Sequence, residues 1–141
     1  MKNIILIINF VLLVCFNNAQ TPLIDTVKKQ LAQAKDDTAR FGILSHIAVM
    51  YISYNPDSAM IMAQQSISLA KKLKTDEALS NALKAYAGVL SQTGNYPQAI
   101  YFLQEALKLA EKSKNLPTIG WSYGFLSATY TEAEDYQHAL F

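Results

Sequence analysis

Residues 83–110 read LKAYAGVLSQTGNYPQAIYFLQEALKLA, and this stretch decides the fold. On both sides of a short break, apolar residues recur every three or four positions, the spacing at which side chains share one face of a helix. The break is Gly94-Asn95-Tyr96-Pro97, where a polar residue and a proline follow each other in the order typical of a helix start. The stretch therefore predicts two helices joined by a tight turn.

The same unit recurs along the chain at an offset of forty residues. Equivalent positions keep their size and polarity, as in the triplets Ile43/Leu83/Tyr123, Met50/Leu90/Tyr130 and Ala59/Ala99/Ala139. A period of about 20 to 50 residues indicates a stacked array in which each unit buries its apolar face against the next. The sequence therefore predicts repeats of two antiparallel helices, packed closely where the alanines lie.

Polar caps and prolines divide the chain into its expected elements. Helices are expected at about 22–35, 38–53, 56–73, 76–93, 96–113 and 117–133, followed by a last helix that stops at Phe141. The corresponding organisation is a flanking helix in 20–36 and repeats at 37–76, 77–116 and 117–141, the third truncated. No window alternates polar and apolar residues for long enough to argue for a strand, so the expected fold class is all-α.

Position by position, the chain resembles the tetratricopeptide repeat (TPR) family. The residues that carry this resemblance are Leu83, Ala87, Leu90, Gly94, Tyr96, Ala99, Leu103 and Ala106. The resemblance implies a right-handed array of antiparallel helix hairpins, an α-solenoid, with a concave face that binds a protein or peptide. The usual unit has about 34 residues, so a period of forty implies helices about one turn longer.

A narrower resemblance concerns function. The order of signal peptide, Asp-Thr-Ala-Arg at 37–40 and Asn-Pro-Asp-Ser-Ala at 55–59 is similar to the exported amino-terminal regions of bacterial TPR sensor histidine kinases and related regulators. It implies an alternative function, in which the chain is the extracytoplasmic sensor segment of a truncated membrane kinase or transcriptional regulator. In that case the membrane would be reached only through a segment downstream of Phe141.

Residues 1–19 have the three parts of a secretory signal peptide. Lys2 provides a positive start, 4–16 is almost unbroken Ile, Leu, Val and Phe, and Ala19 is a small residue at the expected cleavage point. The apolar run is shorter than the roughly 20 residues of a spanning helix. We therefore expect export to the periplasm or beyond; lipidation at Cys15 is the rival interpretation, which the large Val14 before it disfavours.

Composition excludes several function classes. Twelve basic against eleven acidic residues give a net charge of +1, too little for a nucleic-acid binder. One cysteine and two distant histidines, His46 and His138, offer no metal site, and we expect His46 to be partly buried on a core position. Without a glycine-rich phosphate loop or an acid–base constellation, we expect no cofactor, no metal and no enzymatic activity.

The interaction surface implied by the resemblance is the stripe of each first helix that faces the concave side. Its expected positions are Phe41, Leu44, Ala48 and Tyr51, then Asn81, Lys84, Gly88 and Gln92, and then Trp121, Gly124, Phe125 and Ala128. The side chains expected to form the partner-binding groove are Phe41, Leu44, Tyr51, Asn81, Lys84, Gln92, Trp121 and Phe125.

Trp121 and Phe125 lie one helical turn apart and could form an apolar pocket for a partner's side chain. The other interpretation is that they pack against the second helix of the second repeat or against the following chain. TPR domains that capture a terminal carboxylate use Lys and Asn along this stripe. Lys84 matches one such position, but Gly88 stands where the Asn is needed, so a mixed or apolar groove is expected instead.

Overall fold

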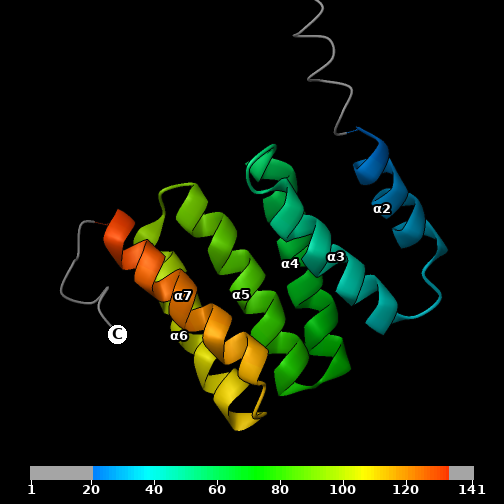
Figure 1. The fold of residues 1–141 in the computed structure, drawn as a ribbon. Helices are drawn as coiled ribbons and strands as arrows, with labels where there is room; N and C mark the ends of the chain where they lie inside the picture. The colour runs from blue at the N-terminus through cyan, green and yellow to red at the C-terminus, as the bar shows by residue number, and fades with distance from the viewer. Residues whose placement is uncertain (1–20, 134–141) are drawn as a thin grey trace, which may run out of the picture. The chain divides into compact units, whose positions relative to one another are not determined.

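The computed structural model describes residues 21–133, all of them in helices or in the short connections between helices. The order is α2 (Thr21–Gln33), α3 (Asp37–Tyr51), α4 (Pro56–Leu73), α5 (Asp76–Gln92), α6 (Tyr96–Lys112) and α7 (Leu116–Glu132) (Figure 1). The expected all-α fold is confirmed, and each helix boundary lies within two residues of the expected one. The signal peptide, the last helix and Ala139 lie outside the described residues.

Two compact units divide the chain after Gln33. The described part of the first unit is α2, a helix of 13 residues. The second unit contains α3 to α7, and only this unit is discussed below. Its division into repeats at 37–76 and 77–116 remains our interpretation, with α3 and α4 forming the first hairpin and α5 and α6 the second.

Polar caps begin the helices of the second unit, because a side-chain oxygen replaces the missing intrahelical acceptor for an early backbone N–H. Asp36 accepts from the Ala39 N–H at 2.8 Å, Asn55 from Ser58 at 2.9 Å, and Thr75 from Ala78 at 3.2 Å. Asn115 caps α7 in the same way, at 3.1 Å from the Thr118 nitrogen. At the start of α6, Asn95 makes no side-chain cap bond, and the turn there contains Gly94 with a φ of +79° and Pro97 in the first helical turn. Most helix starts in this unit therefore follow from the local sequence.

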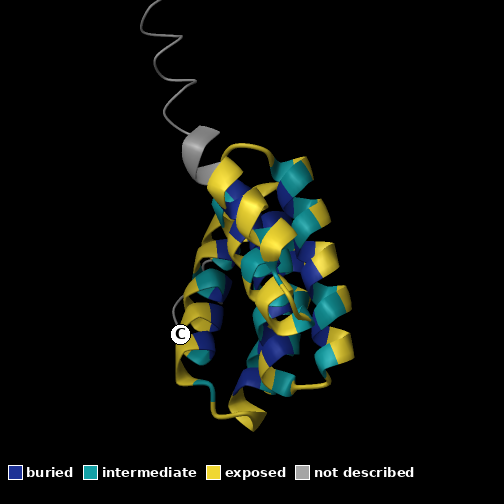
Figure 2. Cartoon of the chain, turned by 90° about the vertical axis from the view of Figure 1, so that its right-hand side faces the viewer, coloured by how far each residue is buried: buried dark blue, intermediate teal, exposed yellow. Residues whose placement is uncertain are grey.

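The five helices form two layers. The first helices α3, α5 and α7 lie side by side, and α4 and α6 form the layer behind them (Figure 1). Each helix packs on the next in the chain, and α5 also contacts α3 and α7, so it is the central element. Figure 2 marks the buried residues in dark blue on the ribbon; they alternate with exposed residues along each helix, so each helix buries one side.

Alanines are frequent among the fully buried residues of the core. Ala59 and Ala99, the two described members of the alanine triplet, are fully buried, as expected. Leu103 and Ala87 lie in a cluster with Leu126, which joins α5, α6 and α7. A methyl group at a crossing lets two helix axes approach closely, and a larger side chain would separate them. The packing therefore depends on small residues in fixed register.

Candidate functional site

A groove opens between the first helices of the two hairpins, with a cavity volume of about 280 Å³. It is lined by Phe41, Gly42, Ser45, His46 and Val49 from α3 and by Asn81, Lys84 and Ala85 from α5. We call it the α3–α5 groove. The structure thus brings together three of the predicted groove residues, Phe41, Asn81 and Lys84.

On α3 the predicted stripe is wrong by about one residue. Leu44 and Tyr51 are only 4% and 7% exposed, and Ala48 between them is fully buried, so these residues are not available to a partner. The physical reason is that α3 contacts both α4 and α5, and its apolar side turns toward them. The residues left on the groove side are shifted, and Ser45 and Val49 take the expected places.

His46 is a further correction. Its repeat equivalents, Tyr86 and Leu126, are half-buried and buried, but His46 itself is exposed and lines the groove. A repeat alignment assigns the same environment to equivalent positions. At this position the environments differ: Tyr86 packs against the Phe102 ring of α6, whereas His46 lines the groove shared with α5.

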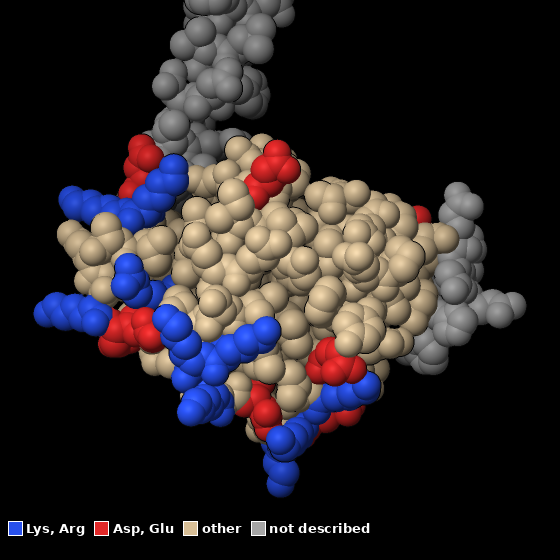
Figure 3. Space-filling view, turned by 180° about the vertical axis from the view of Figure 1, so that it is seen from behind, with Lys and Arg blue, Asp and Glu red and all other residues tan. Residues whose placement is uncertain are grey.

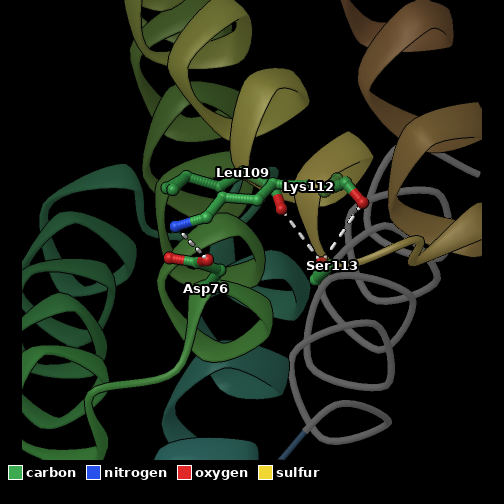
Figure 4. Close-up of polar contacts among 5 residues, drawn as sticks. Asp76, Leu109, Lys112 and Ser113 are labelled. Atoms are coloured by element: carbon green, nitrogen blue, oxygen red, sulfur yellow. Dashed lines mark hydrogen bonds and ion pairs between the residues drawn. The ribbon is translucent and has the colours of Figure 1, made fainter.

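Lys84 is the one charged residue that lines the α3–α5 groove. Its ammonium group is about half-buried in the middle of α5, and this burial lowers the pKa of Lys84 below the ordinary value of 10.5. Within the described part of the chain, the ion pairs join Lys108 to Glu105 at 2.6 Å and Lys112 to Asp76 at 2.8 Å (Figure 4). Neither involves Lys84, so its charge has no ion-pair partner among these residues.

The other basic side chains of α4 and α6 have more favourable positions. Lys71 and Lys72 lie in the last turn of α4 and Lys112 in that of α6, where a positive charge complements the helix dipole. Figure 3, a view from the side of these two helices, shows basic and acidic side chains along its left and lower edges and an acidic group at the top, around a broad area without charged side chains. Lys84 lies away from the ends of α5 and forms no ion pair with any residue of the described range 21–133.

Two polar groups lie beside Lys84 in the groove. The carbonyl Oδ1 of Asn81 accepts a hydrogen bond from the Thr118 hydroxyl at 2.7 Å, which fixes the amide and leaves its nitrogen as the remaining donor. The Ser45 hydroxyl is buried and has no hydrogen-bond partner within the described part of the chain. The groove therefore presents donors of hydrogen bonds together with the apolar side chains of Phe41 and Val49.

Trp121 occupies a position that contacts the next repeat in both earlier hairpins. Its equivalent Phe41 packs against a cluster that includes Ala78 of α5, and its equivalent Asn81 bonds Thr118 of α7. Trp121 itself is 62% exposed and lies tilted against Phe125, with ring centroids 6.1 Å apart. The position therefore belongs to repeat stacking as well as to the predicted concave stripe.

Phe125 and Gln92 complete the predicted set. Phe125 is half-buried and packs against α5, where a Cβ added to Gly88 would lie 3.6 Å from the phenylalanine ring and 3.5 Å from Ile52. Gly88 is thus a buried packing residue, and a Cβ at this position would make ordinary van der Waals contact with both side chains. Gln92 is exposed at the end of α5 and does not line the groove.

The described residues contain no group of three or more His, Cys, Asp or Glu side chains placed to hold a metal ion. None of the helices in 21–133 is both long enough and apolar enough to cross a membrane.

The layered hairpins, the buried alanines and the polar caps define a tetratricopeptide repeat domain, a class of fold that serves as a protein-interaction module. A model of the family described as the SusR N-terminal TPR domain matches residues 16–139, and the chain belongs to this family. No curated protein and no solved structure matches the chain. The expected TPR fold is therefore confirmed, whereas the narrower resemblance to sensor kinases remains a prediction.

Proposed function

We propose that this chain is a non-catalytic module, exported from the cytoplasm, that binds a protein or peptide ligand in the α3–α5 groove. The observation that carries the proposal is the groove itself, an open cavity between two first helices of a TPR domain, with apolar and polar side chains on its walls. TPR domains commonly bind protein partners, and solenoids leave such a surface free while their core is buried.

The same groove supports the absence of catalysis. Its titratable side chains are Lys84 and His46, and no carboxylate lines it to orient a base or to share a proton. Ser45, the one hydroxyl on its wall, has no hydrogen bond to a base. We therefore propose recognition without turnover, with no cofactor or metal and no nucleic acid involved.

A selection experiment tests the binding proposal. Random linear peptides displayed within a carrier protein are selected on the chain, and the affinity of a selected peptide is measured for two arginine variants. Val49 in the groove and Ile61 on α4 are both exposed apolar residues, at 46% and 53%, so they form a matched pair. Val49→Arg should lower the affinity at least about tenfold, because it fills the groove, and Ile61→Arg should not. The reverse order, or no selected peptide at all, would refute the proposal.

Export has a separate test. The pattern of 1–19 supports it, and mass spectrometry of the chain purified from the expressing cell would then find an amino terminus at Gln20. An intact Met1 would refute cleavage.

The second candidate function is a sensor segment of a larger membrane kinase or regulator. It is favoured by the family description, because an N-terminal domain is followed by further chain in the protein for which the family is named. Reading the coding frame downstream of Phe141 tests it: an apolar run of about 20 residues followed by a further domain supports the sensor, and a stop codon contradicts it. Contact with the membrane would depend on that segment.

A further inference from the structure

Three residues of the α3–α5 groove are unfavourable for the stability of the free domain. Lys84 has a half-buried charge, Ser45 a buried hydroxyl without a partner, and Gly42 a poor helix former in the middle of α3. All three line the same cavity. Residues that weaken a fold and converge on one surface are typical of a binding site, where activity and stability compete.

Few charged side chains lie near Lys84 along the two helices of the groove. Residues 41–51 of α3 and 78–92 of α5 contain no other Asp, Glu, Lys or Arg. Glu77, two turns before Lys84 on α5, lines the adjoining cavity and accepts a hydrogen bond from the Asn115 amide. A half-buried ammonium group without a counterion is stabilised when an anion binds beside it. The groove therefore has an electrostatic preference for a negatively charged group.

No packing contact within the described structure requires a glycine at position 42. At Gly88 a side chain would meet Ile52 and Phe125, but a Cβ built on Gly42 meets nothing within 4 Å. The space next to Gly42 is open to the groove, so a polypeptide backbone can approach α3 closely there. If the backbone of a bound peptide extends past Gly42 in both directions, the groove holds an internal segment of the peptide and not its carboxyl terminus.

The hydrogen-bonding groups point to the same occupant. Lys84 and the amide nitrogen of Asn81 are donors, and no carboxylate lines this groove to repel an anion. A carboxylate accepts hydrogen bonds from both kinds of donor. Phe41 and Val49 provide an apolar surface for the residues that flank it.

We propose that the α3–α5 groove binds an extended peptide segment through an internal Asp or Glu side chain, whose carboxylate pairs with Lys84 while the peptide backbone passes Gly42. This inference rests on the proposed function, since it names the chemistry of the partner at the same groove.

The test is a double-mutant cycle on a peptide selected as described above. Internal display offers no free carboxyl terminus, so an enriched acid must be a side chain. The selected peptides should share one acidic position. In a capped synthetic copy, changing this residue from Glu to Gln (or Asp to Asn) should weaken binding to the chain about 10- to 100-fold, the range of a charge-assisted contact. Binding to the Lys84→Met variant should not distinguish the two peptides.

Lys72→Met is the matched control, because Lys72 is exposed at the end of α4 and its loss changes the net charge equally. This variant should retain the full penalty for the neutral peptide. A second measurement follows Lys84 directly: by NMR of isotopically dimethylated lysines, the acidic peptide should raise the Lys84 pKa and the neutral one should not.

Each other outcome overturns the inference. The inference is contradicted if the selected peptides share no acidic position, or if the Glu-to-Gln change still weakens binding to Lys84→Met. It is also contradicted if a free carboxyl terminus restores the binding of the neutral peptide, or if inorganic phosphate displaces the acidic one. In these cases peptide binding that is still blocked by Val49→Arg leaves the proposed function standing. If no peptide binds at all, both fail.

Discussion

Replacing Gly42 with alanine should make the domain more stable and its groove less able to bind. Gly42 is exposed in the interior of α3, and an added methyl group meets no atom within 4 Å, so the change introduces no strain. Glycine is about 1 kcal/mol less favourable than alanine at such a position. For a unit of this size, a gain of about 1 kcal/mol raises Tm by roughly 4 to 8 °C.

Urea and thermal unfolding followed by circular dichroism at 222 nm measure this effect, and two other glycines provide controls. Gly120 in α7 is equally open and lies outside the groove, so Gly120→Ala should stabilise without affecting peptide binding. Gly94 has a φ of +79°, so Gly94→Ala should destabilise by about 1 kcal/mol. If Gly42→Ala is neutral or destabilising while Gly120→Ala stabilises, or if its stability rises with peptide affinity unchanged, the reasoning about this groove is refuted.

Three further predictions concern packing, turn geometry and pH. Ala99→Leu should cost about 1 to 3 kcal/mol of unfolding free energy, because Ala99 is fully buried, whereas Leu at exposed Gln98 should be nearly neutral; urea denaturation compares them. Lys74→Gly should stabilise by about 0.5 to 1 kcal/mol, because Lys74 has a φ of 56° at the end of α4, and a lower Tm would contradict this. Lys84→Met should be more stable than the unaltered chain at neutral pH. The difference in unfolding free energy between the variant and the unaltered chain should narrow as pH rises from the lowered Lys84 pKa toward 10.5, because the folded chain loses its buried charge before the unfolded chain does. Urea titrations at several pH values measure this difference, and a constant value would show that Lys84 is not desolvated.

The helices could be predicted from the sequence because their ends depend on neighbouring residues. Asn55 and Asn115 each cap a helix that has a proline in its first turn. In both cases the capping hydrogen bond joins residues that are three positions apart in the chain. The burial of Ala59 and Ala99 was also predictable, since the forty-residue period repeats a small residue at each crossing. Local chemistry and periodicity were sufficient for these features.

The groove could be predicted only in part, because its walls depend on which side of α3 turns toward its neighbours. Periodicity places Leu44, Ser45 and Val49 on one helix, but a shift of one residue rotates the helix face by about 100°. Asn81 and Lys84 do line the α3–α5 groove, on α5, which contacts a first helix on each side, but their role in binding stays a prediction. The hydrogen bond from Thr118 that orients the Asn81 amide spans 37 residues, and nothing in the local sequence indicates it.

The two kinds of glycine separate structural constraint from recognition in this domain. Gly88 is buried against Ile52 and Phe125, so a side chain longer than that of alanine would press on these two neighbours. Gly42 is small beside empty space, in the same groove as Lys84, which has no ion-pair partner among the described residues. Fold stability accounts for the first glycine and for neither feature of the groove. A partner that brings both a backbone and a negative charge accounts for the two together.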